Sequence, residues 1–239
     1  MHTGNMKEEY RKWYSLHTGR DFELLVFGHG GIPLILFPSS MGRYYEAKDF
    51  GLIGSVSWFI EQGRVRIYCV DSADAWSWYN KSVHPAERAA NHVCYDRLIL
   101  EEVCGMARQE TGLDRIAVAG CSFGGYHAVN FAFRHPWMVS HVFSMSGAFD
   151  IRGQMDGFYN DEVYFNNPVD FIPDDRNPEL WRLRIILGTS DRDICRGDNE
   201  RMSAILSAKG IGHWLDLRSN ADHDWPVWRE MLPHYLSEL

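Results

Sequence analysis

The chain has 239 residues, of which 45% are hydrophobic and 23% charged, and its net charge is −8 at pH 7. A chain of this length and composition can bury a sizeable core without a disulfide or metal staple, which excludes an intrinsically disordered protein. Because no lysine- and arginine-rich stretch occurs, a nucleic-acid-binding protein is excluded as well.

The first half of the chain begins with strand-like segments at residues 10–16 and 22–27. A short turn at 18–21 joins them, which predicts an antiparallel hairpin. Two more strand segments follow at 33–37 and 65–70, with a helical pattern at 51–62 between them. Pro85 suits a first helical turn, and apolar residues then recur every three or four positions as far as Gln109, which predicts a long helix.

The second half alternates strands with helices. Strands are predicted at 115–120, 138–144, 183–187 and 214–218, and helices at 123–134, 198–209 and 225–238. This alternation predicts an α/β fold: a mostly parallel eight-stranded sheet with helices on both faces and an antiparallel N-terminal edge. No linker or repeat interrupts the chain, so we expect a single domain over residues 1–239, with a small cap around 151–180.

A candidate nucleophile lies where the strand at 115–120 meets the helix at 123–134. Residues 120–124 read Gly-Cys-Ser-Phe-Gly, a Gly-x-Ser-x-Gly motif between an apolar strand and an apolar helix. A serine on such a strained turn projects its hydroxyl above the sheet, and a Cβ two residues before or after it would collide where strand and helix meet. The motif therefore predicts Ser122 as a nucleophile and the Phe123 N–H as one oxyanion donor.

The position of the strands sorts the histidines, because catalytic residues of such sheets lie at the carboxyl ends of strands. His213 precedes the last strand, and His234 lies in the last helix. His127 and His135 belong to the helix after Ser122 and are expected to pack or face solvent. His223 follows the last strand at its carboxyl end, which predicts it as the general base.

The acid that orients the base should also follow a strand. Asp191 and Asp193 both follow the strand at 183–187, and Asp150 follows the strand at 138–144. Spacing alone does not choose between the first two, and Asp150 is the more distant alternative. With either Asp191 or Asp193, the chain order is Ser, Asp, His, as in α/β-hydrolases.

These motifs resemble the putative esterase family of α/β-hydrolases, the branch that holds esterase D, enterochelin esterases, feruloyl esterases and mycolyltransferases. The resemblance spans nearly the whole chain and is carried by residues 120–125, 188–199 and 222–228. In relatives the acid precedes a helix-entry asparagine by six positions, as Asp193 precedes Asn199. The resemblance thus favours Asp193 over Asp191, although two extra residues after Gly188 depart from the family pattern.

The resemblance also implies the second oxyanion donor. In the family it follows a small turn after the third strand, which here points to the backbone N–H of Ser40, with Ser39 and Met41 as alternatives. Beyond the strand at 65–70 lie Trp76, Trp78 and Tyr79. We expect them to form an aromatic wall for the acyl or aryl group of a substrate, or to pack their loop onto the core.

Together these residues predict a serine hydrolase that cleaves small-molecule carboxylic esters through a Ser-His-Asp triad and an acyl-enzyme, without metal or organic cofactor. An acyltransferase or thioesterase with the same triad, and a non-catalytic binding protein of the same fold, are the alternatives. Five cysteines lack metal-ligand spacing and are expected to be buried or half-buried thiols. No apolar run reaches the ~20 residues of a membrane span, so we expect a cytoplasmic protein without a membrane partner and leave a homo-oligomer open.

Overall fold

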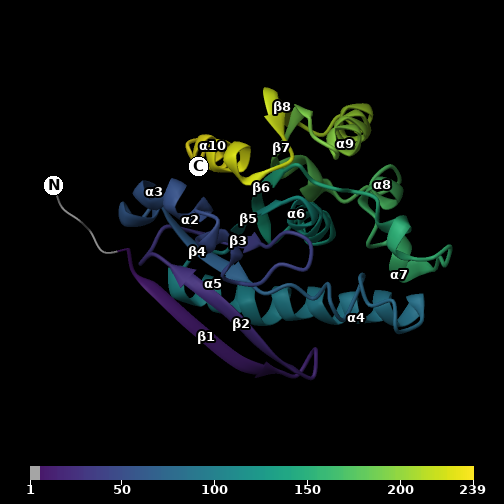
Figure 1. Cartoon of the computed structure of the whole chain (residues 1–239), viewed down its shortest axis with the longest axis horizontal. Coiled ribbons are helices and arrows are strands. Elements are labelled where there is room, and N and C mark those ends of the chain that lie inside the picture. The colour runs from purple at the N-terminus through teal and green to yellow at the C-terminus, as the bar shows by residue number, and fades with distance from the viewer. Residues whose placement is uncertain (1–5) are drawn as a thin grey trace.

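The computed structural model describes residues 6–239, which contain one eight-stranded sheet of order β1-β2-β4-β3-β5-β6-β7-β8 (Figure 1). The strands are β1 (Glu8–Ser15), β2 (Arg20–Phe27), β3 (Ile32–Phe37), β4 (Val65–Val70), β5 (Ile116–Cys121), β6 (Val139–Met145), β7 (Arg184–Arg192) and β8 (His213–Asp222). β2 runs antiparallel to both β1 and β4, and all the other pairs are parallel. The predicted mostly parallel sheet with an antiparallel N-terminal edge is therefore confirmed.

The helices include those that the apolar pattern predicts, and also short ones at residues 46–49 and between residues 151 and 182 that it does not predict. They are α1 (Glu46–Asp49), α2 (Leu52–Ser55), α3 (Ser57–Glu61), α4 (Pro85–Arg97), η1 (Leu98–Val103), α5 (Cys104–Thr111), α6 (Phe123–Arg134), η2 (Ile151–Gln154), α7 (Asp161–Tyr164), α8 (Pro168–Phe171), η3 (Pro178–Arg182), α9 (Arg196–Lys209) and α10 (Trp225–Leu236). α4, the π-helical turn η1 and α5 together form the long helix that begins at Pro85 (Figure 1).

One predicted helix, over residues 51–62, is wrong in detail. The chain there forms α2 and α3, which are separated at Val56, and Gly51 precedes α2 in a left-handed conformation with φ 77°. Val56 has φ −111° and ψ 11°, outside the helical region, and is fully buried. A glycine, two serines and a β-branched residue between positions 54 and 57 have weak helix propensity, so burial of Val56 outweighs helix continuity.

Two strands run further than the apolar pattern predicts. The β7–β8 ladder continues through Gly188–Asp216, Thr189–Leu217 and Ser190–Arg218, and an irregularity follows between Ser190 and Arg192. These pairs mix polar and apolar residues, so the pattern of apolar residues ends before the backbone pairing does. The extension carries Asp191 within β7 and leaves Asp193 just beyond its end.

Helices cover both faces of the sheet, as predicted. Successive strand residues point to opposite faces: in β3, Leu34 and Leu36 pack with residues of α2 and α10, whereas Ile35 and Phe37 pack with residues of α4, α5 and α6. All residues of β4 and β5 are buried, as expected for central strands covered on both sides. The carboxyl end of this central strand β5 therefore lies between the two helical layers that cover the sheet.

The segment between β6 and β7 holds the short helices η2, α7, α8 and η3 (Figure 1). It occupies the position of the cap expected around residues 151–180. None of the helices in residues 6–239 has the length and apolar character needed to cross a bilayer.

Candidate active site

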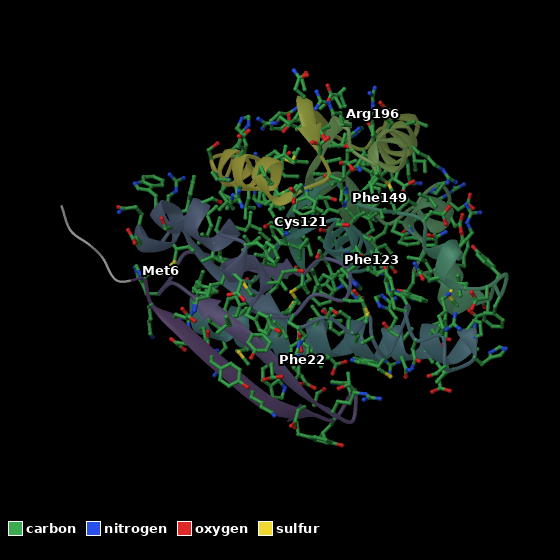
Figure 2. The ribbon with its side chains drawn as sticks, viewed as in Figure 1. Met6, Phe22, Cys121, Phe123, Phe149 and Arg196 are labelled. Atoms are coloured by element: carbon green, nitrogen blue, oxygen red, sulfur yellow. The ribbon has the colours of Figure 1, made fainter. Side chains whose placement is uncertain are left out.

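Ser122 occupies a strained turn between β5 and α6, as the motif predicts. Its backbone has φ 56° and ψ −122°, a region that residues with a Cβ rarely adopt. The Ser122 N–H donates to the Met145 carbonyl at 2.8 Å, which ties the turn to β6. Figure 2 shows its neighbours Cys121 and Phe123 near the middle of the view.

The two glycines of the motif allow the chain segments around Ser122 to approach. A Cβ on Gly120 would lie 2.1 Å from the Gly124 carbonyl oxygen, and a Cβ on Gly124 would lie 2.4 Å from the carbonyl oxygen of Pro38. Both distances are far inside van der Waals contact, so the predicted steric need for glycine is confirmed. The second contact also shows that the chain leaving β3 packs directly against the first turn of α6.

His223 lies just beyond the carboxyl end of β8 and reaches Ser122. Its Nε2 is 2.9 Å from the Ser122 Oγ, although the two residues are 101 positions apart. The indole of Trp228, in the first turn of α10, meets the imidazole edge-on with centroids 5.2 Å apart. The Trp228 Nε1–H donates in turn to the Ser146 Oγ at 2.9 Å, so packing and a buried hydrogen bond orient this ring.

Asp193 is the carboxylate that contacts His223. Its Oδ1 lies 2.6 Å from the His223 Nδ1. The same carboxylate accepts hydrogen bonds from the Thr189 hydroxyl at 2.9 Å and from the Cys195 N–H at 2.8 Å. Burial by itself raises the pKa of Asp193, but hydrogen bonds from His223, Ser146, Cys195 and Thr189 lower that pKa to about 2. The carboxylate is therefore held ionised beside the imidazole.

The other two aspartates considered from sequence have different partners. The Asp191 carboxylate accepts hydrogen bonds from the backbone N–H groups of Asn220, at 2.8 Å, and Ala221, at 3.3 Å. Asp150 pairs through its carboxylate with Arg152 and, at 3.2 Å, with Arg201. Neither hydrogen-bonds to His223 in the described part of the chain.

The three loop amides considered as oxyanion donors differ in what they bond. The Ser39 N–H donates to Glu46 Oε2 at 2.8 Å, and the Met41 N–H donates to Asp74 Oδ2 at 2.9 Å. Within residues 6–239, the N–H groups of Ser40 and Phe123 have no hydrogen-bond acceptor. These two amides are thus the ones left to bond a substrate oxygen.

The three aromatic residues expected to line the site differ in exposure. Tyr79 lies at the site: its hydroxyl is 3.1 Å from the Ser40 Oγ, and its ring meets that of Phe123 edge-on. Trp78 is completely buried against His92, so it cannot contact a substrate in this structure. Trp76 packs on Tyr95, and the guanidinium of Arg20 lies over its ring.

Sequence reasoning missed the residues that hold the candidate catalytic groups in place through hydrogen bonds. Thr189, in the extended β7, donates its hydroxyl to Asp193 at 2.9 Å, and Ser146, which follows β6, contributes to the lowered pKa of Asp193. Glu46 and Asp74 bond the loop that carries Ser40. Asp74 lies just beyond the carboxyl end of β4, so the strand-end rule that selected His223 could also have found it.

A further group of potential metal ligands adjoins the site. The Sγ of Cys195 and ligand atoms of Asp193 and His223 all lie within 4.8 Å of one another. The Asp193 and His223 atoms are already hydrogen-bonded to each other. All five cysteines are free thiols, and each is buried or half-buried, as predicted.

Comparison with known proteins gives one family and several solved structures of similar fold. A family model described as "Putative esterase" matches residues 68–239. Among solved structures, a ferulic acid esterase is 17% identical with TM-score 0.79, covering 97% of this chain and 96% of its own. S-formylglutathione hydrolases from Staphylococcus aureus (15% identity, TM-score 0.75, covering 98% of each chain) and Agrobacterium tumefaciens (13%, 0.78, 99% and 95%) are also similar. No curated protein matches the sequence.

Proposed function

The chain belongs to the putative esterase family, and from this premise we propose that it is a serine hydrolase that cleaves carboxylic esters through an acyl-enzyme. The observation that carries the proposal is the hydrogen-bond chain from Ser122 through His223 to Asp193, with distances of 2.9 and 2.6 Å. A hydroxyl, an imidazole and a carboxylate in this order can activate the hydroxyl as a nucleophile.

In the first step, Ser122 Oγ attacks the ester carbonyl carbon while His223 Nε2 takes the hydroxyl proton. The electron pair of the carbonyl moves onto its oxygen, and the N–H groups of Phe123 and Ser40 bond that oxyanion. The tetrahedral intermediate then collapses, and the alcohol leaves with the proton held by His223. Water attacks the acyl-enzyme by the same route and releases the carboxylic acid.

Asp193 acts through the histidine. Its carboxylate fixes the proton on His223 Nδ1, so that Nε2 is free to accept from Ser122, and it stabilises the imidazolium formed in each step. Four donors, namely His223, Ser146, Thr189 and the Cys195 N–H, keep it ionised. Asp191 has no such role in this mechanism, because its carboxylate bonds the backbone of Asn220 and Ala221 instead.

We propose small-molecule esters as substrates, with Tyr79 lining the side next to Ser40. The single domain, its small cap, the cytoplasmic location and the homo-oligomer considered from the sequence stay predictions. Ser122 itself supports the enzyme over a non-catalytic binding protein, because strained backbone that positions a hydroxyl beside an imidazole has no use in binding alone.

The experiment is active-site labelling followed by an ester panel. A fluorophosphonate probe should modify the wild-type protein stoichiometrically at Ser122, identified by peptide mass spectrometry. Ser122→Ala should lose the label and up to about 10⁶-fold of turnover. The matched control, Ser55→Ala, removes a serine hydroxyl that bonds only the Leu52 carbonyl among the described residues and should keep both.

Absence of labelling, together with no hydrolysis of short-chain, long-chain or aryl esters, would refute the enzyme. Product analysis with added alcohols and thioesters separates the alternatives that share the acyl-enzyme. Transfer of the acyl group to an alcohol in preference to water would identify an acyltransferase. Faster cleavage of the thioester than of the matched oxygen ester would identify a thioesterase.

A further inference from the structure

A buried carboxylate outside the triad joins the two segments that carry the oxyanion amides. Asp74 is completely buried. Its Oδ2 accepts the Met41 N–H at 2.9 Å, next to Ser40, and its Oδ1 lies 2.8 Å from the His127 Nε2. His127 is also buried and belongs to α6, four residues after Phe123. One side chain therefore contacts both the loop that carries Ser40 and the helix that carries Phe123.

The loop side of this bridge needs an external hold. Met41 has φ 59°, a left-handed conformation that costs a residue with a Cβ about 1 kcal/mol or more. Such a conformation persists only where surrounding contacts fix it. Asp74 fixes the amide of Met41, and Glu46 fixes Ser39 through both its N–H, at 2.8 Å, and its hydroxyl, at 2.7 Å. Ser40 thus lies between two anchored amides.

The helix side of the bridge is rigid. The His127 ring stacks on Phe37 with centroids 5.8 Å apart and meets Phe123 edge-on at 5.0 Å. Phe37 ends β3, directly before the loop, and Phe123 supplies the other amide. A displacement of His127 would therefore shift both Phe37, which precedes the loop of Ser40, and Phe123. The carboxylate and the imidazole are both buried, so the bond between them is expected to be strong.

We infer that Asp74, bridged to His127, is a positioning residue that sets the separation between the Ser40 and Phe123 amides. This inference rests on the proposed function, because it concerns the oxyanion formed during ester cleavage. Without the carboxylate, Met41 can relax and the Ser40 N–H can turn away from the Phe123 N–H. The lost hydrogen bonding should destabilise the transition state, in which the oxygen carries charge, and should hardly change binding of the neutral ester.

The test compares Asp74→Ala with wild type on an aryl ester and on an aryl trifluoromethyl ketone. The ketone bonds Ser122 Oγ to its carbonyl carbon; the carbonyl pair becomes an oxyanion and His223 takes the proton, so its inhibition constant reports on the two amides. We expect kcat to fall 10- to 100-fold with KM within about threefold, since displacing one donor costs somewhat less than deleting it. The inhibition constant of the ketone should rise by the same factor.

Two further variants separate positioning from general stability. Asp74→Asn keeps an acceptor oxygen for the Met41 N–H and should recover at least half of the loss on a logarithmic scale; it also serves if Asp74→Ala does not fold. Tyr126→Phe is the matched control: it removes a buried hydrogen bond from the same helix, to the Asn166 carbonyl at 2.8 Å, and leaves the loop untouched. It should lower Tm without changing kcat.

The inference fails if folded Asp74→Ala, or Asp74→Asn in its place, keeps kcat and the ketone inhibition constant within threefold of wild type. It also fails if Tyr126→Phe lowers kcat as much for an equal loss of Tm. Either result would leave the proposed function standing, provided that the wild type hydrolyses esters and is labelled at Ser122. A wild type that does neither removes the proposed function instead.

Discussion

Adding one methyl group at Gly124 should weaken catalysis without touching a catalytic side chain. The Cβ of Gly124→Ala would lie 2.4 Å from the Pro38 carbonyl oxygen and 2.6 Å from that of Phe37. Ordinary contacts begin near 3.4 Å, so the chain after β3 must retreat by about 1 Å. Ser40 lies two residues beyond Pro38, and its N–H retreats with the chain.

A misplacement of about 1 Å in a catalytic group costs up to ~10²-fold in rate. We therefore expect kcat/KM of Gly124→Ala to fall about 100-fold, which corresponds to roughly 2.7 kcal/mol of lost transition-state stabilisation. The assay is steady-state hydrolysis of an aryl acetate by purified protein, with folding checked by circular dichroism and thermal unfolding.

Gly105→Ala is the matched control. Its added Cβ would meet nothing within 4 Å, and Gly105 lies inside α5. Alanine there should leave kcat/KM unchanged and stabilise the helix by about 0.5–1 kcal/mol. Full activity in a folded Gly124→Ala protein would refute the view that the contact between Pro38 and α6 sets the position of the oxyanion loop.

Three other predictions concern Asp193 and Tyr79. Asp193→Ala should reduce kcat by about 10³–10⁴-fold, whereas Asp191→Ala should stay within threefold of wild type in the same aryl-ester assay; the reverse order would exchange their roles. Because the folded-state pKa of Asp193 is lowered from 3.8 to about 2, its stabilisation is present above about pH 5 and is lost as pH falls through 2. When the pH is lowered from 6 to 2, the free energy of urea unfolding of wild type should therefore fall by about 2 kcal/mol more than that of Asp193→Asn. An equal fall in both proteins would contradict this. Tyr79→Phe removes only the bond to the Ser40 hydroxyl, so kcat should change less than threefold; a loss above tenfold would show that the hydroxyl, and not the amide, of Ser40 takes part.

Local patterns were sufficient for the sheet and for the turn at Ser122. The glycines at 120 and 124 are required by contacts between adjoining segments, so their spacing in the sequence carries the geometry directly. His223 could be selected because it follows the predicted strand at 214–218, and it still lies beyond the strand although β8 continues to Asp222.

The position of Asp74 after β4 could be found from the sequence, but its burial and its pairing with His127 could not. Asp74 and His127 are 53 residues apart, and nothing near either residue distinguishes a buried aspartate from a solvated one. For Trp78 the sequence left two possibilities open, substrate contact and packing onto the core, since a tryptophan after a strand end fits both, and the structure shows it packed in the core. The choice between Asp191 and Asp193 depended on where β7 ends, and the polar residues of its extension hid that end.

The strained backbone of Ser122 makes thermal stability and catalytic activity favour different residues at this position. At φ 56° and ψ −122°, glycine would be relaxed where serine is not, so Ser122→Gly should unfold at a higher temperature than the parent. A library of variants screened for thermal survival alone would thus drift toward inert proteins. A search for stabilised variants of this protein must therefore measure activity as well as thermal stability and keep Ser122 unchanged.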